Sequence, residues 1–215
     1  MTIAALGGLR MRFDVLAEID KYRKHPRFQV ERHFDIFLIP YLPNIINYFY
    51  NSNYEFAVPE FPLRKALVND RFKSRYESIS VDYAIFDRTK KKIACIELKT
   101  DNESHSVIQD QNMKRLSMSV TAAQLLEFIE ERTKYQLKNV TTYKFGELKR
   151  FLESTGAWKC RTGKIEYFKV GPTNSRISDL NYLSFSKIIS EYEDKSDDWK
   201  DIRRYLEKWD NNINS

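Results

Sequence analysis

Residues 79–100 have the sequence ISVDYAIFDRTKKKIACIELKT, in which two apolar runs flank a basic turn. Side chains of a β-strand alternate between its two faces, and the second run is apolar at both alternating sets of positions. The stretch therefore predicts a β-hairpin with strands at Ile79–Asp87 and Ile93–Thr100, covered by other elements on both faces. Charges within such strands need an explanation, because Glu and Lys are seldom fully buried unless they are paired.

Three charged side chains are expected to meet at one end of this hairpin. If the turn is centred between Thr89 and Lys90, Asp82 faces Glu97 across the ladder, and Lys99 lies on the same strand face as Glu97. Opposed carboxylates repel each other unless a cation neutralises them, and a hard divalent ion with oxygen ligands is a common neutraliser. The pattern favours a functional site, with a structural cluster of ion pairs as the alternative.

Asp82 and the triplet Glu97-Leu98-Lys99 resemble the motif of the PD-(D/E)XK nuclease superfamily, with Val81 where the family name has proline. The resemblance implies an α/β (α+β) fold with a restriction-endonuclease-like core. In such a fold a central mixed β-sheet is flanked by helices on both faces, and here N-terminal and C-terminal helical additions are expected. The resemblance also implies that Asp82, Glu97 and the Leu98 backbone carbonyl bind Mg²⁺ (or Mn²⁺). Lys99 would orient or activate the attacking water.

A further acid often joins sites of this family from the first helix or the first strand. Glu60, on the expected first strand, and Glu31, on an expected helix, are the candidates in this chain. For each of them a surface carboxylate is an equally favoured interpretation.

The function that the resemblance implies is Mg²⁺-dependent hydrolysis of phosphodiester bonds in nucleic acid, with DNA expected before RNA. The complete Asp, Glu and Lys set favours an enzyme over a nuclease-fold module that binds nucleic acid or protein without cutting. A third alternative is an α/β interaction module whose hairpin is structural. No specificity domain is recognisable, so the sequence leaves open the preference for DNA or RNA and for endonucleolytic or exonucleolytic cleavage.

The chain of 215 residues has the composition of one globular domain, with a net charge of +6. A basic balance fits a polyanionic partner without requiring one. We expect a single nuclease-like domain over residues 1–215. Its helical N-terminal part, core and helical C-terminal part are expected at residues 1–51, 54–172 and 180–215.

Basic residues gather at two places near the hairpin. One group precedes it and could contact phosphates near the site; its members are Arg64, Lys65, Arg71, Lys73 and Arg75. The other forms the turn, at the end of the hairpin opposite Asp82, and a solvated turn is the favoured interpretation; its members are Arg88, Lys90, Lys91 and Lys92.

Helices are expected on both sides of the hairpin in the sequence. The shorter ones are expected at residues 13–24, 28–39, 43–50 and 144–154. One long helix is expected from Ser104 or Ser106 to about Gln136, with an apolar stripe that packs on the sheet.

The remaining segments predict two more strands and a helical tail. Tyr54–Arg64 contains two prolines and is expected to form an edge strand at most. Lys164–Val170 alternates as a strand that would extend the sheet beside Glu97. Leu180–Trp209 is expected to be helical, with an aromatic side that packs into the core. The same aromatic residues would allow a homodimer, which is the less favoured use.

Composition also bears on where the protein works. Phe34–Tyr50 is apolar but interrupted by prolines and polar residues, so we expect neither a membrane span nor a membrane partner. Cys95 and Cys160 lack the spacing of a zinc site or a disulfide framework, which indicates a reducing compartment. We therefore expect a cytoplasmic location.

Overall fold

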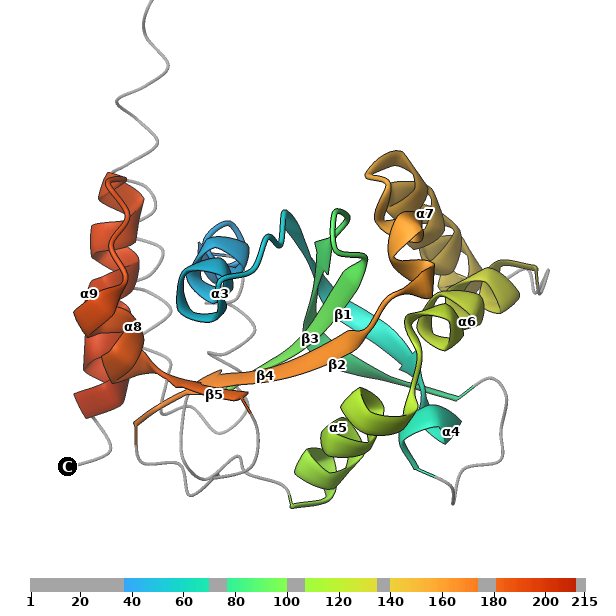
Figure 1. Ribbon diagram of the computed structural model, residues 1–215, viewed down its shortest axis with the longest axis horizontal. Coiled ribbons are helices and arrows are strands. Elements are labelled where there is room, and N and C mark those ends of the chain that lie inside the picture. The colour runs from blue at the N-terminus through green and yellow to red at the C-terminus, as the bar shows by residue number, and fades with distance from the viewer. Residues whose placement is uncertain (1–36, 70–76, 100–106, 135–139, 174–180, 212–215) are drawn as a thin grey trace, which may run out of the picture.

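The computed structural model describes residues 37–69, 77–99, 107–134, 140–173 and 181–211, which form an α/β fold (Figure 1). Its centre is a five-stranded mixed sheet with the order β1-β2-β3-β4-β5. The strands are β1 (Phe56–Arg64), β2 (Ser78–Asp87), β3 (Lys92–Leu98), β4 (Ile165–Gly171) and β5 (Asn181–Ser184). β2 is antiparallel to both of its neighbours, whereas β3, β4 and β5 are parallel to one another.

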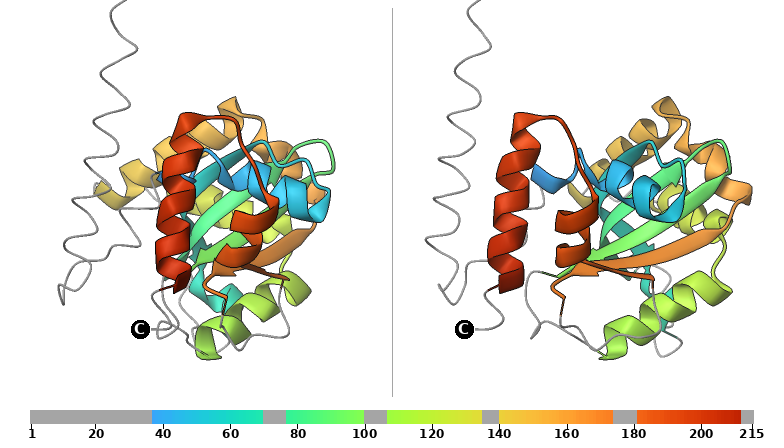
Figure 2. Two further views of the ribbon diagram at one scale, coloured as in Figure 1. Left: turned by 90° about the vertical axis from the view of Figure 1, so that its left-hand side faces the viewer. Right: turned by 60° about the vertical axis from the view of Figure 1, so that its left-hand side comes forward.

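Helices cover both faces of this sheet (Figures 1 and 2). One face packs against α3 (Leu42–Tyr50), α8 (Phe185–Glu191) and α9 (Asp197–Asn211). The other face packs against α4 (Lys65–Val68), α5 (Val107–Ser119), α6 (Ala122–Lys134), α7 (Val140–Ser154) and the 3-10 helix η1 (Ala157–Thr162). The expectation of a mixed sheet with helices on both faces is therefore confirmed.

The hairpin strands supply both hydrophobic cores because their apolar side chains alternate. Tyr83 and Ile96 pack with α3, α8 and α9, whereas Phe86 and Cys95 pack with the helices of the other face. All four side chains are fully buried. Complete burial of a large apolar side chain contributes about 1.5–3 kcal/mol, so this hairpin anchors both layers.

From the turn to the pair Tyr83 and Ile96, the hairpin has the register that the sequence predicts, but the expected pair of Asp82 and Glu97 lies beyond the end of the ladder. At its turn Asp87 lies opposite Lys92, which centres the turn between Thr89 and Lys90. Asp87 Oδ1 accepts hydrogen bonds from the backbone N–H groups of Thr89 at 3.0 Å and Lys90 at 2.8 Å. Lys91 adopts a left-handed conformation with φ of 54°. An aspartate that binds its own turn in this way fixes the register from local chemistry.

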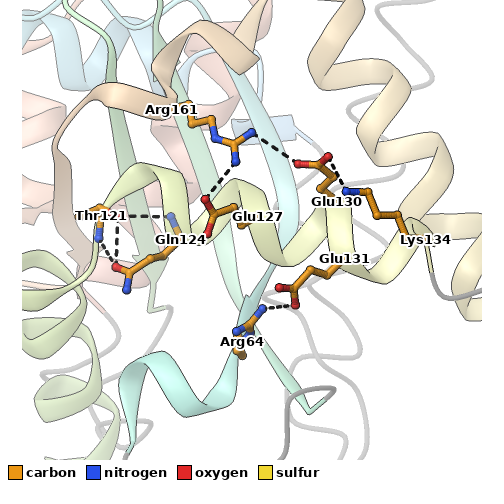
Figure 3. A network of polar contacts seen from close by, with 8 residues as sticks. All are labelled: Arg64, Thr121, Gln124, Glu127, Glu130, Glu131, Lys134 and Arg161. Carbon is orange, nitrogen blue, oxygen red and sulfur yellow. Dashed lines mark hydrogen bonds and ion pairs between the residues drawn. The ribbon is translucent and has the colours of Figure 1, made fainter.

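The single long helix predicted from Ser104 or Ser106 to Gln136 is wrong, because the described part of this segment forms two helices, α5 and α6. The predicted ends of that helix lie outside the described residues. At the break, the Thr121 N–H donates to Gln124 Oε1 at 2.8 Å, and the Gln124 N–H donates to Thr121 Oγ1 at 3.3 Å (Figure 3). This capping box satisfies backbone donors at a new helix start and so favours two helices.

The prediction of a wholly helical segment Leu180–Trp209 is also wrong in its first part. Its described residues begin with β5, which pairs with β4, and only then enter α8. Ser184 ends the strand and caps the helix, since its Oγ accepts the Lys187 N–H at 3.2 Å. The packing of α9 into the core is confirmed by four buried side chains, Trp199, Ile202, Leu206 and Trp209.

Other expected elements are present where the structure describes them. α3 and α7 match the predicted helices, and β1 is an edge strand that contains Pro59 and Pro62. The helix predicted at residues 13–24 and most of that at 28–39 lie outside the described residues. Within the described segments, every helix is too short or too polar to cross a bilayer.

Ion pairs fasten α6 to two neighbouring elements (Figure 3). Arg161 of η1 bonds to Glu127 at 3.0 Å and to Glu130 at 3.4 Å. Arg64, at the end of β1, pairs with Glu131 of α6. These side chains are partly exposed, and together with Lys134 they form what we call the α6 network.

Candidate active site

The sheet forks at Asp82. β2 remains paired with β1 on both sides of this residue, whereas its ladder with β3 ends at the pair Tyr83 and Ile96. Beyond that pair, Asp82 Oδ2 accepts a hydrogen bond from the Leu98 backbone N–H at 2.7 Å. The carboxylate thus takes the place of a main-chain acceptor, and the charge-assisted bond holds it at the point where the two strands part.

Glu97 and Lys99 form a buried ion pair beside this fork. Lys99 Nζ lies 2.8 Å from Glu97 Oε1, and the two residues are only 6% and 2% exposed, respectively. Lys99 directly follows β3, and its backbone N–H donates to the Val170 carbonyl at 2.8 Å. The structure therefore brings the predicted lysine to a predicted acid, in a position anchored by the sheet.

A glycine on β4 makes room for the lysine. A Cβ added to Gly171 would lie 3.1 Å from Lys99 Cβ and 3.0 Å from Tyr182 Oη. Such distances are tighter than ordinary van der Waals contacts, so a side chain here would displace the stem of Lys99. Gly171 thus belongs to the packing that sets the position of the ammonium group.

The charge of Glu97 acts on the face of the sheet that α5, α6 and α7 cover. Cys95 is fully buried on that face and precedes Glu97 by two positions in β3. Burial raises the pKa of the Cys95 thiol to about 12, and the negative charge of Glu97 adds to the rise. Strand alternation places the two side chains on the same face of the sheet.

A second lysine, which the sequence interpretation missed, stands next to Glu97. Lys169 is the Cα partner of Glu97 in the parallel ladder of β3 and β4, and it is completely buried. Its position confirms the prediction that the strand at Lys164–Val170 extends the sheet beside Glu97. The signal that could have found Lys169 is the one that identified Glu97, namely a charged residue within a strand that is covered on both faces.

Glu60 lies in register beside Asp82, on the opposite side from β3. The flanking pairs are Pro59 with Tyr83 and Phe61 with Val81, so Glu60 falls opposite Asp82 where the ladder is interrupted. Its φ is 48°, a conformation that few residues other than glycine adopt.

The carboxylate of Glu60 is bonded to a serine of β2. Glu60 is exposed, and its Oε2 accepts a hydrogen bond from Ser80 Oγ at 3.0 Å. The structure therefore brings Glu60 near Asp82 in the sheet but bonds its side chain to another residue. The other candidate acid, Glu31, lies outside the described residues.

Four of the described basic residues near the hairpin are paired with acids. Arg64 pairs with Glu131, and Lys65 lies 3.7 Å from Glu77. Arg71, Lys73 and Arg75 lie outside the described residues. In the turn, Arg88 pairs with Glu55 and Lys92 with Glu166, while Lys90 and Lys91 are exposed.

The donor set at the fork suits a hard divalent cation. Asp82 and Glu97 offer carboxylate oxygens from adjacent strands, and the ammonium group of Lys99 is paired with Glu97. Within the described segments, no group of three or more His, Cys, Asp or Glu side chains is placed to hold a metal ion. One or two carboxylates nevertheless suffice for Mg²⁺, which usually completes its coordination with water and substrate phosphate oxygens.

Comparison with known proteins adds no assignment. Neither protein-family models, nor curated proteins, nor solved structures give a significant match to this chain. Its functional interpretation therefore depends on the fork itself: Asp82 bound to the backbone of β3, and Glu97 between two buried lysines.

Proposed function

We propose that this protein is a Mg²⁺-dependent nuclease of the PD-(D/E)XK type, which hydrolyses phosphodiester bonds through Asp82, Glu97 and Lys99. The observation that carries the proposal is the buried contact of 2.8 Å between Lys99 and Glu97, beside the carboxylate of Asp82. The order of elements supports it: a first strand, a charged hairpin, a helical segment that contains α5, α6 and α7, and a further strand beside Glu97. This is the order that the restriction-endonuclease-like core has in the resembled family.

Energetics favour a functional over a purely structural use of these charges. The desolvation penalty of a buried ion pair often exceeds its Coulombic gain, so apolar residues of similar volume would stabilise the sheet at least as well. The chain nevertheless has one buried acid, Glu97, and two buried lysines at this point, with the partly buried Asp82 beside them. Buried charges that a fold does not need for stability are characteristic of sites that act on a ligand.

In the proposed reaction each side chain has a separate task. Asp82 and Glu97 would hold the Mg²⁺ with carboxylate oxygens, and the Leu98 carbonyl is the further ligand that the resemblance predicts. The ion, when bound, supplies an activated water and neutralises charge that develops on the scissile phosphate. Lys99 would exchange its bond to Glu97 for one to the attacking water or to the phosphate, and so offset transition-state charge.

A cleavage assay with matched variants tests the proposal. The purified protein is incubated with supercoiled plasmid, single-stranded DNA and RNA, in the presence of Mg²⁺, Mn²⁺ or EDTA. Cleavage is expected only with the divalent ions, and Lys99→Ala is expected to lower its rate by about 100- to 1,000-fold, the usual effect of removing one transition-state donor. Lys92→Ala is the control, because it removes a paired lysine at the other end of the same hairpin.

The same assay decides between the proposal and its alternatives. Nucleic-acid binding without cleavage by the wild-type protein would select a non-catalytic binding module. Neither binding nor cleavage would select an interaction module with a structural hairpin. Equal loss of cleavage in Lys99→Ala and Lys92→Ala would contradict the specific role given to Lys99.

A further inference from the structure

Glu97 is flanked by two buried lysines that differ in their place in the sheet. Lys99 stands just beyond the end of β3, at the fork, and its Nζ contacts Glu97 Oε1. Lys169 lies within β4, which is paired with β3 on one side and β5 on the other. Lys99 is therefore at the rim of the sheet, whereas Lys169 is in its interior.

Lys169 presents its charge to the same face as Glu97. Strand alternation places Glu97 with Cys95 and places Lys169 with Tyr167, and both of these neighbours belong to the core beneath α5, α6 and α7. Lys169 is the Cα partner of Glu97 and is fully buried, so the two residues are neighbours across the β3–β4 ladder in a region shielded from water. A fully buried ammonium in this position cannot reach a substrate without disrupting the sheet.

Glu97 needs a second lysine as a countercharge if Lys99 turns from it to the substrate during the reaction. When Lys99 turns to the substrate, the carboxylate of Glu97 loses a bonded cation while it remains buried. A buried charge left without compensation is strongly destabilising. A second ammonium that stays in place removes this penalty, and the geometry of β4 supplies one.

We propose that Lys169 is a positioning residue that acts as the permanent countercharge of Glu97, which allows Lys99 to leave Glu97 and serve the substrate. This inference rests on the proposed nuclease function. It assigns the two lysines distinct roles: Lys99 at the reacting atoms, and Lys169 behind the metal-binding carboxylate.

Lys169→Met tests this role, because methionine retains the unbranched stem and removes the charge. Its kcat for cleavage should fall by about 10- to 100-fold with KM unchanged, as is usual for groups that support a metal ligand. In calorimetric titration with Mn²⁺ alone, the same variant should bind the ion severalfold more tightly than the wild type, because a repelling cation is gone. The matched control is Lys164→Met, which neutralises an exposed lysine just before β4 and should change neither quantity.

Slower cleavage together with tighter metal binding is a signature that damage to the fold would not produce, because a damaged site loses both. Weaker or unchanged Mn²⁺ binding in Lys169→Met would overturn the inference.

A readout without metal or substrate separates this inference from the proposed function. Lys169→Met should lower the midpoint of urea unfolding, and adding Glu97→Gln in the same chain should recover part of that loss by neutralising the remaining imbalance of charge. If the wild type neither cleaves nor binds Mn²⁺, the nuclease proposal fails, and the midpoints alone decide the role of Lys169. No recovery by Glu97→Gln would show that Lys169 is not the countercharge of Glu97.

Discussion

The fork and the α6 network are both rich in opposite charges, yet they differ in burial and in what holds the charges. In the α6 network, Arg161 and its glutamate partners are between about a quarter and a half exposed and link separate elements across the surface (Figure 3). At the fork, Glu97 and Lys99 are nearly inaccessible, and the carboxylate of Asp82 is fixed by a backbone N–H.

The difference shows why only one of these regions is a candidate active site. Exposed ion pairs are screened by water and salt and contribute about 0–1 kcal/mol each, so they can be replaced with little effect. Buried charges have strong fields and fixed geometry, which suit them to bind a cation and stabilise a developing charge. The expected effects of mutations in the two regions should therefore differ in kind as well as in size.

The largest expected effect is on cleavage by variants of the two acids. Asp82→Asn and Glu97→Gln should each lower the cleavage rate by more than about 100-fold, because a metal ligand is lost. The amide introduced by Asp82→Asn would still offer an oxygen to the Leu98 N–H, so unfolding of that variant should change little. Glu127→Gln, an equivalent change in the α6 network, should cleave at the wild-type rate. Divalent-dependent cleavage retained in either acid variant would rule out the assignment.

The next largest effect is on stability, and it compares the loss of Glu97 alone with the loss of both Glu97 and Lys99. Glu97→Ala takes the acid away from two buried lysines and should lower the free energy of unfolding by about 3–5 kcal/mol. The double variant Glu97→Ala, Lys99→Met should be less destabilised than the single one, as measured by urea unfolding. A double variant with the sum of the two single losses would show that the pair is not coupled.

A smaller effect is expected in the α6 network. Arg161→Ala removes the contacts to Glu127 and Glu130 and should lower the free energy of unfolding by about 1 kcal/mol or less. The loss should shrink further in 1 M NaCl, where the screening length is only about 3 Å. A loss as large as that of Glu97→Ala would erase the contrast between the two regions.

The smallest effect concerns pH. The hydrogen bond from Lys134 holds the pKa of the Glu130 carboxyl below its ordinary value of 4.5. Because the folded-state pKa is depressed, this stabilisation is present above that ordinary value and is lost as the pH falls through the folded-state pKa. The difference in unfolding free energy between wild type and Lys134→Met should be about 0.3–0.5 kcal/mol at pH 7 and vanish in acid. A difference that persists at pH 2 would indicate lost packing instead.

The elements that the sequence predicts well are those set by local chemistry. Asp87 binds the turn through Thr89 and Lys90, so the hairpin register follows from a few adjacent residues. Pro59 and Pro62 confine β1 to the sheet edge for an equally local reason. The meeting of Glu97 and Lys99 follows from strand alternation once the hairpin is recognised.

The sequence predicts an element poorly where two local signals compete or where the element depends on residues distant in the chain. Apolar positions continue at helical spacing through the break between α5 and α6, so the periodicity predicts one helix. The capping box of Thr121 and Gln124, which starts a second helix, does not disturb that periodicity. β5 has only four residues, too few to show an alternating pattern of burial, and its pairing with β4 stabilises it as a strand. The sequence places the strand at Lys164–Val170 beside Glu97 but not its register, so the pairing of Lys169 with Glu97 is a finding of the structure.

The central claim is that the acids at the fork hold a divalent cation. A crystal of the wild-type protein soaked in Mn²⁺ and measured for anomalous scattering tests it most directly. The account predicts a peak about 2.1 Å from a carboxylate oxygen of both Asp82 and Glu97. A peak bound only by other residues, or none at a saturating concentration of Mn²⁺, would contradict it.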